Sequence, residues 1–185
     1  MEETKRKKPL QWHPGFYAGL QIELAEDADN LTFENEHQLG TKPKQIDVLI
    51  IKKDSTKPIK KNIGRIFRKY NIVEYKGPED YLSIDDFYRV CGYTCFYKSD
   101  AEGVNRIPVE ELTITYVCHR YPAKVMQHLK GKGCRIQNVA EGIYYIEGIF
   151  FPIQIVLTSR LSKEENLWLG SLTNQLQDIE TAESW

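Results

Sequence analysis

Three charged residues interrupt two otherwise apolar stretches of the sequence. Asp47 lies in the run QIDVLIIKK, and Glu74 and Lys76 lie in the run IVEYKGP. In a β-strand, residues two apart share a face, so Asp47 falls on one face with Leu49, and Glu74 and Lys76 fall on one face with Ile72. Burying a carboxylate or an ammonium beside aliphatic side chains is costly unless the group is paired or binds a metal. If the two strands are neighbours in register, two carboxylates and a lysine meet at one point.

This combination suits the metal-dependent hydrolysis of a phosphodiester. Mg²⁺ prefers oxygen ligands, and a bound cation polarises a phosphate and lowers the pKa of a water molecule. Asp47 and Glu74 would ligate Mg²⁺ or Mn²⁺ together with the backbone carbonyl of Tyr75, and Lys76 would contact the attacking water or the phosphate. The alternative interpretation is a salt bridge among these residues on a solvated face, which is typically worth about 0 to 1 kcal/mol.

The elements that must position these residues can be predicted from the spacing of apolar and β-branched side chains. The strongest strand signal is the run of Ile, Val and Leu that contains Asp47. Ser83, followed three residues later by Asp86, resembles a capped helix start. The predicted order is a helix over 14–25, strands over 31–39, 45–52 and 71–76, and a helix over 83–98. In the strand over 31–39, strict alternation places His37 on the face of Leu31 and opposite Glu34.

The second half of the chain continues the alternation of strands and helices. The expected fold class is therefore mixed α/β, with a central mixed β-sheet flanked by helices. The final helix has Ser162 as its predicted N-cap, with Glu165 at the capping-box position. The predicted elements are a strand over 111–118, a helix over 122–129, two strands within 135–147, a strand over 153–157 and a helix over 162–176.

The order of these motifs resembles a known superfamily. A helix carrying Glu, the strand QIDVLIIKK, the strand IVEYKGP and a following helix together resemble the PD-(D/E)XK nucleases. The longer match, from WHPGFYAGLQIELAE to IDDFYRVCGYTCFYK, is similar to a bacterial group of transposase-like, recombination-promoting nucleases and covers roughly residues 12 to 98. Ile46 stands where the superfamily motif has proline. The resemblance implies a restriction-endonuclease-like core and Mg²⁺-dependent cleavage of DNA, linked to a mobile element or to genome defence.

The resemblance also implies further site residues on the flanking helices. The superfamily uses a Glu on its first helix, and Glu23 is the natural counterpart, with Glu36 on the first strand as its competitor. The glutamine-and-tyrosine helix motif of exonuclease-like members is not cleanly present. Arg89 and Tyr93, one turn apart on the helix after Lys76, are the candidates for that supporting role.

A basic stretch between the two strands is the candidate nucleic-acid interface. From Lys42 to Lys76 the sequence holds eleven Lys and Arg against three Asp and Glu, a local charge of +8 in a chain whose net charge is −1. A local excess of this kind would attract a phosphate backbone and make binding dependent on salt, although a solvated lysine-rich loop has the same composition. The candidate contacts are Lys52, Lys53, Lys60, Lys61, Arg65, Arg68 and Lys69.

Composition bounds the organisation of the chain. Its 185 residues, 41% hydrophobic, suit a single nuclease-like domain over residues 12–177, preceded by a flexible basic arm over 1–11 and followed by an acidic tail over 178–185. No stretch approaches the roughly 20 apolar residues that span a bilayer, and the basic start lacks a signal region, so we expect a cytoplasmic protein with no membrane partner. The four cysteines are expected to be buried thiols in a reducing compartment.

Two functions are compatible with these patterns. The first is a Mg²⁺-dependent DNA endonuclease, with DNA a better expectation than RNA; a homodimer would suit cleavage of both strands of a duplex. The second is a nucleic-acid-binding or interaction module that retained the fold without catalysis. Only the first requires a bound cation.

Overall fold

The computed structural model of this chain describes residues 12–38 and 45–171. The predicted basic arm and acidic tail lie outside the described residues, as do Lys42 and Lys44. The helices are α1 (Trp12–Glu23), α2 (Ile84–Ser99), α3 (Ala123–Gly131) and α4 (Leu167–Gly170), with short 3-10 helices η1 (Ala25–Asn30), η2 (Asn62–Gly64) and η3 (Val109–Glu111). The strands are β1 (Leu31–Gln38), β2 (Gln45–Lys52), β3 (Tyr70–Tyr75), β4 (Leu112–Cys118), β5 (Arg135–Ala140), β6 (Ile143–Glu147) and β7 (Ile153–Leu157).

One seven-stranded mixed sheet organises the chain, in the order β1-β2-β3-β4-β7-β6-β5. The pairs β1–β2, β2–β3, β7–β6 and β6–β5 are antiparallel, whereas β3–β4 and β4–β7 are parallel. Parallel neighbours need a crossover, and α2 makes the connection between β3 and β4. The central strands β4 and β7 are buried along their whole length because helices cover both faces of the sheet. These findings confirm the predicted mixed α/β class.

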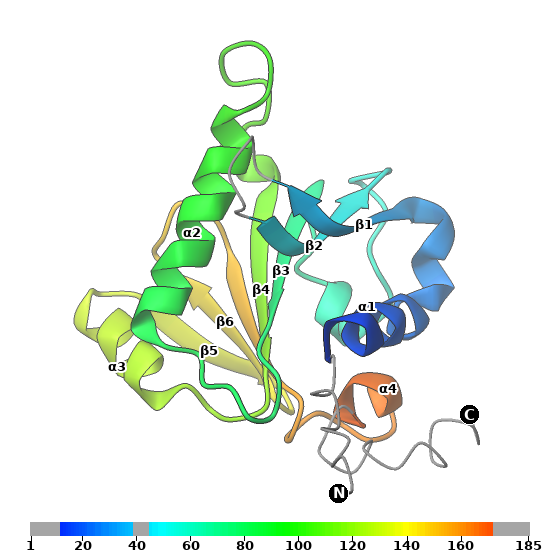
Figure 1. The fold of residues 1–185 in the computed structure, drawn as a ribbon, viewed down its shortest axis with the longest axis vertical. Coiled ribbons are helices and arrows are strands. Elements are labelled where there is room, and N and C mark those ends of the chain that lie inside the picture. The colour runs from blue at the N-terminus through cyan, green and yellow to red at the C-terminus, as the bar shows by residue number, and fades with distance from the viewer. Residues whose placement is uncertain (1–11, 39–44, 172–185) are drawn as a thin grey trace, which may run out of the picture.

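Two hydrophobic cores lie on the two faces of the sheet (Figure 1). On one face, α2 and α3 pack over Leu49, Ile72 and Tyr116. On the other, α1, α4 and the segment after β2 pack over Val48 and Val73. Because successive strand residues face opposite sides, the α2 face is also the face of Glu74, two residues after Ile72. α1 therefore covers the sheet on the side away from Glu74.

Three local predictions are wrong. Glu36 has a φ of 51°, which rotates the end of β1, so that His37 turns toward Glu34 and its ring lies 5.5 Å from that of Tyr97 on α2. The last helix begins at Leu167 rather than at residue 162; Ser162 Oγ does accept the amide of Glu165 at 3.4 Å, but only a turn follows. All four cysteines are free, and Cys95 is exposed rather than buried.

No helix within residues 12–38 and 45–171 is both long enough and apolar enough to cross a membrane.

Candidate active site

Asp47 and Glu74 face each other across the antiparallel pair of β2 and β3. The ladder ends with the pair Val48–Val73, and Asp47 and Glu74 are the residues immediately beyond that last pair. At this end of the ladder the backbone amide of Tyr75 donates to Asp47 Oδ2 at 3.0 Å. The aspartate side chain thus binds an amide where strand pairing ends, and this contact holds the carboxylate beside Glu74. The predicted meeting of the two carboxylates is what the structure shows.

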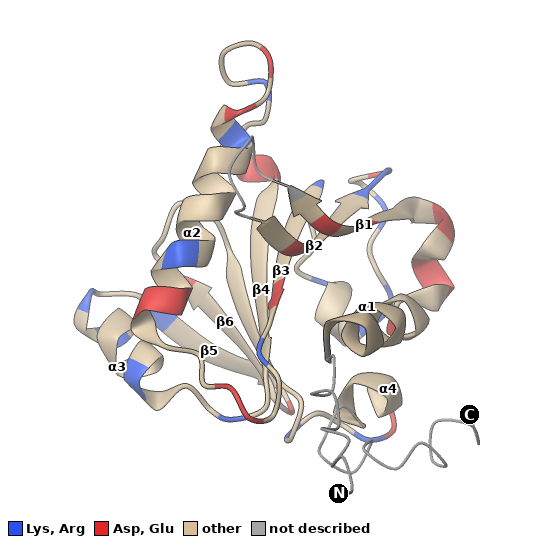
Figure 2. Ribbon diagram, in the orientation of Figure 1, with Lys and Arg blue, Asp and Glu red and all other residues tan. Residues whose placement is uncertain are grey.

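Lys76 joins the pair from the end of β3 and brings α2 with it. Its Nζ lies 3.4 Å from Asp86 Oδ2, and its positive charge also acts on Glu74. Asp86 receives a second cation, since Arg89 Nη1 donates to its Oδ1 at 2.9 Å. Figure 2 shows where these charges lie on the ribbon. An acidic position lies within β3, a basic position lies just past its end, and charges of both signs lie at the start of α2.

The start of α2 is held in place by a cap and by an aromatic stack. Ser83 and Asp86 form a capping box, in which Ser83 Oγ accepts the Asp86 amide and Asp86 Oδ2 accepts the Ser83 amide, both at 3.0 Å. Tyr116, the neighbour of Glu74 in β4, donates its hydroxyl to the carbonyl of Phe87 at 2.6 Å, and the two rings stack. Asp86 therefore has a fixed position above the end of β3.

Two carboxyls of the cluster, Glu74 and Asp86, have pKa values shifted in opposite directions. Burial, followed by the negative charge of Asp47 and a hydrogen bond with it, raises the pKa of Glu74 to about 8, against a smaller lowering by Lys76. Burial also tends to raise the pKa of Asp86, but hydrogen bonds from Ser83 and the charge of Lys76 outweigh it and hold that pKa below its usual value. At neutral pH Glu74 therefore keeps its proton beside Asp47, while Asp86 is ionised beside two cations.

Glu23, the predicted acidic residue of the first helix, is not part of this cluster. It lies on the opposite face of the sheet, where Asn166 Nδ2 donates to its Oε1 at 2.7 Å and Lys61 Nζ lies 3.6 Å away. Asn62 completes this buried network with Asn166. Glu23 lies away from the cluster because α1, which carries it, packs over the face of the sheet that contains Val48. Glu36, its competitor, is level with Asp47 in the β1–β2 register, between the pairs Asn35–Val48 and His37–Ile46.

The two predicted helix residues have different positions. Arg89 reaches the cluster through Asp86, as described above. Tyr93 is half-buried and packs against the core on the α2 face. The structure thus brings Asp47, Glu74, Lys76 and Arg89 together and leaves Glu23 and Tyr93 outside.

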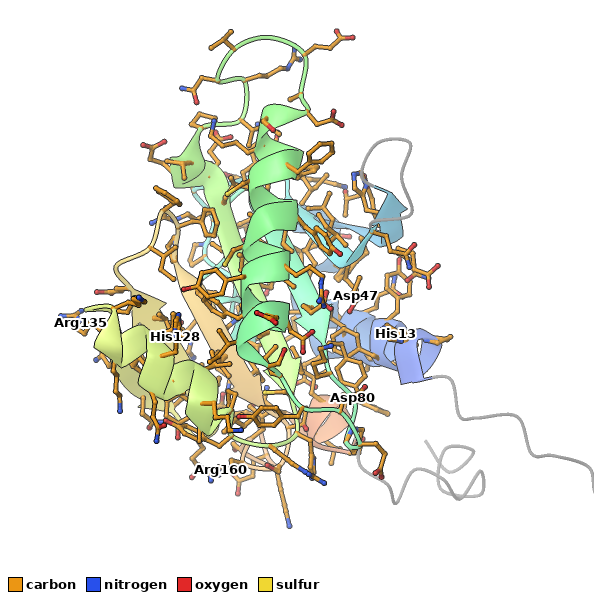
Figure 3. All side chains as sticks on the ribbon, turned by 60° about the vertical axis from the view of Figure 1, so that its left-hand side comes forward. His13, Asp47, Asp80, His128, Arg135 and Arg160 are labelled. Carbon is orange, nitrogen blue, oxygen red and sulfur yellow. The ribbon has the colours of Figure 1, made fainter. Side chains whose placement is uncertain are left out.

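Two residues of the site were missed by the sequence prediction. Asp86 was interpreted only as a helix-capping residue, and its position three residues into the helix that follows Lys76 was the available signal. His13 lies at the start of α1, and its Nε2 is 3.6 Å from Asp47 Oδ2. His13 and Asp47 lie on the same side of α2 (Figure 3). No pattern in the sequence around His13 indicates this contact.

The predicted basic interface is spread along a different part of the molecule. Lys52 is the last residue of β2 and lies five residues after Asp47, so it lies about 17 Å from Asp47 at the usual rise per strand residue, and Lys53 follows it outside the strand. Lys52 is buried, and its ammonium donates to the carbonyl of Ser55, so it is wrong as a surface contact. Lys61 is paired with Glu23, on the side of the sheet away from the cluster.

The remaining basic candidates differ in their exposure and in the contacts that their charged groups already make. Lys53, Lys60, Arg65 and Arg68 are exposed, and Lys69 lies 5.4 Å from the centre of the Tyr70 ring. Arg68 already donates to the carbonyl of Glu110 at 2.8 Å. These residues do not converge on the Asp47–Glu74 pair.

A divalent cation could be held at the Asp47–Glu74 pair. Two carboxyls that face each other offer oxygen ligands to a cation, which would displace the proton of Glu74. Within residues 12–38 and 45–171, no three His, Cys, Asp or Glu side chains gather into a complete cage. A cation here would take its other ligands from backbone carbonyls, water or substrate, which is how Mg²⁺ is usually held.

Comparisons with known protein families, with curated proteins and with solved structures find no match to this chain.

Proposed function

We propose that the chain is a Mg²⁺-dependent nuclease that hydrolyses phosphodiester bonds of DNA, built on a restriction-endonuclease-like core of the PD-(D/E)XK type. The observation that carries the proposal is the facing pair Asp47–Glu74 with Lys76 beside it. This pair is poor as a structural device, because Glu74 stays uncharged only by keeping a proton, and its ionisation would place two like charges side by side in a half-buried place. It is well suited to binding a cation.

Each residue has a part that follows from its contacts. Asp47 and Glu74 would hold the cation, and the backbone amide of Tyr75 would keep Asp47 in place through its hydrogen bond. When bound, Mg²⁺ would neutralise charge on the phosphate and lower the pKa of a nearby water. Lys76 would stabilise the phosphate charge, and Asp86 would position Lys76, since its carboxylate holds the ammonium at 3.4 Å.

DNA is the proposed substrate because the motif order resembles DNA nucleases and because one exposed cation lies at the edge of the cluster and others lie farther along the molecule. Arg89 lies at its edge, and Lys53 and Lys60 lie farther along the molecule. These contacts would be electrostatic, so binding would weaken as salt rises. A homodimer would give two sites for the two strands of a duplex. A role in a mobile element or in genome defence is part of the same proposal.

Plasmid cleavage with Mg²⁺ or Mn²⁺ tests the proposal. The wild-type protein should nick or linearise supercoiled DNA, and Asp47→Asn, Glu74→Gln and Lys76→Ala should each lower the rate by about 10²- to 10³-fold, the usual cost of losing a preorganised charged group. The matched controls Glu147→Gln and Lys124→Ala change exposed residues outside the cluster and should cleave normally. If no metal supports cleavage while DNA still binds, the non-catalytic binding module replaces the nuclease.

A further inference from the structure

A pocket of about 490 Å³ lies between α2, α3 and the segment that joins β6 to β7. Its volume is within the range of roughly 300 to 1,000 Å³ typical of small-molecule sites. It is separate from the candidate active site: in Figure 3, His128 of α3 lies on the other side of α2 from Asp47.

The walls of the pocket are apolar, and two rings at its mouth are unusually exposed. Phe87 and Phe151 are buried within the walls. Phe150 is 80% exposed, and Tyr88 is 49% exposed with its hydroxyl held by His128 Nε2 at 2.6 Å. Exposed aromatic rings beside an apolar pocket are typical of ligand and partner sites.

Three cysteines add sulfur atoms to this apolar lining. Cys91, Cys95 and Cys134 contribute to the walls, and all are free. Burial raises the pKa of Cys91 to about 11, so its thiol is uncharged at neutral pH. The pocket thus presents sulfur and carbon to its contents.

Gly92 keeps one wall of the pocket open. It lies in the middle of α2, where glycine costs about 1 kcal/mol relative to alanine. A Cβ added at Gly92 would meet no atom within 4 Å. The helix therefore tolerates a side chain at this position, and Gly92 is one of the residues that line the pocket.

The charge of the lining is of one sign. Lys132, at the end of α3, is the charged residue among the described residues that line the pocket, and no carboxylate lines it. A ligand that fills apolar walls and meets one ammonium is best matched by an apolar body with a single negative group. The alternative of a neutral ligand would leave that ammonium without a role in binding.

We infer that this pocket binds a small amphipathic monoanion, an aromatic or aliphatic acid whose apolar body fills the space beside Gly92 and whose acidic group pairs with Lys132. This site lies beyond the proposed nuclease function and does not depend on it.

Fluorescence titration with two probes tests the inference: anilinonaphthalenesulfonate, an aromatic monoanion, and phenylnaphthylamine, its uncharged analogue. The sulfonate should bind saturably to one site per chain. Gly92→Phe should abolish this binding, whereas Gly92→Ala should keep it within about twofold, because both substitutions fit α2 and only the first fills the pocket. Thermal unfolding of both variants checks that they are folded.

Charge reversal tests the acidic group separately. Lys132→Glu should weaken binding of the sulfonate by about three- to fivefold, from the usual strength of exposed ion pairs, and should leave binding of phenylnaphthylamine unchanged. Lys130→Glu changes an exposed neighbour on α3 that does not line the pocket and should leave both probes unaffected. Asp47→Asn should also bind both probes normally, which separates this site from the nuclease proposal.

Three results would overturn the inference. The first is unchanged sulfonate binding by a folded Gly92→Phe variant. The second is an equal loss of both probes in Lys132→Glu. The third is that the wild-type protein is a dimer and binds neither probe, while Gly92→Phe is a monomer. A second copy of the chain would then occupy the pocket in place of a small molecule.

Discussion

Glu74→Gln should remove a pH dependence from the free energy of unfolding of the metal-free protein. Burial, and then the charge of Asp47, raise the pKa of Glu74 from 4.5 to about 8 in the folded chain. The folded protein therefore keeps a proton that the unfolded chain releases. The resulting stabilisation is complete below the unfolded pKa of 4.5, declines as pH rises and is lost above about pH 8.

The magnitude follows from the interval that the titration covers. Between about pH 6 and about pH 8.5 the wild-type protein should lose up to about 3 kcal/mol through this carboxyl, at about 1.4 kcal/mol per pH unit below its pKa. Glu74→Gln carries no titrating group there and should show a correspondingly flatter pH profile.

Urea-induced unfolding with EDTA and a reducing agent measures this difference. Glu147→Gln is the control, because the Glu147 side chain is 57% exposed and pairs with Arg135 at the surface; it should keep the wild-type pH profile. Parallel profiles for the wild type and Glu74→Gln would refute the raised pKa of the buried Glu74 carboxyl.

Three further substitutions test the framework around the site by urea-induced unfolding. Asn166→Ala should cost about 2 to 4 kcal/mol, because it leaves the buried carboxylate of Glu23 without its amide donor; a cost below about 1 kcal/mol would contradict that network. Gly142→Ala should cost more than Gly103→Ala, which should lose only about 1 kcal/mol: both glycines have positive φ, but a Cβ at Gly142 would lie 2.8 Å from backbone atoms, whereas one at Gly103 would meet nothing within 4 Å. Equal costs would argue against this close approach. Ser83→Ala should cost about 1 kcal/mol through loss of the cap of α2, and no change would mean that the cap is dispensable.

The positions of Asp47 and Glu74 could be predicted because both residues lie on strands, where the side-chain direction follows from the residue number. Period-two alternation places Glu74 beside Ile72, and the run of Ile and Val around Asp47 marks the neighbouring strand. The same rule predicts burial of Lys52, because it shares a face with Val48 and Ile50. The lysine-rich composition of the surrounding segment led instead to its interpretation as a surface contact.

Side chains brought in by helices could not be placed in the same way. The four-residue spacing of Phe16, Leu20 and Leu24 predicts that one side of α1 is buried, but not which face of the sheet it covers. Glu23 was therefore assigned to the wrong face. Asp86 was predicted only as the capping residue of α2. Its contact with Lys76 was missed because the capping pattern does not show that the same carboxylate also binds a lysine at the end of a strand. The positive φ of Glu36 within β1 has no sequence signal, because a positive φ is uncommon for Glu.

The most direct test of the metal site is a crystal structure of the protein with Mn²⁺ at about pH 8.5, measured by anomalous scattering. The account predicts one ion bound by both Asp47 and Glu74, with oxygen–metal distances of about 2.0 to 2.5 Å. The same crystals of Asp47→Asn should show no ion there. An empty site in the wild-type protein, with the two carboxyls still hydrogen-bonded to each other at saturating Mn²⁺, would contradict the account.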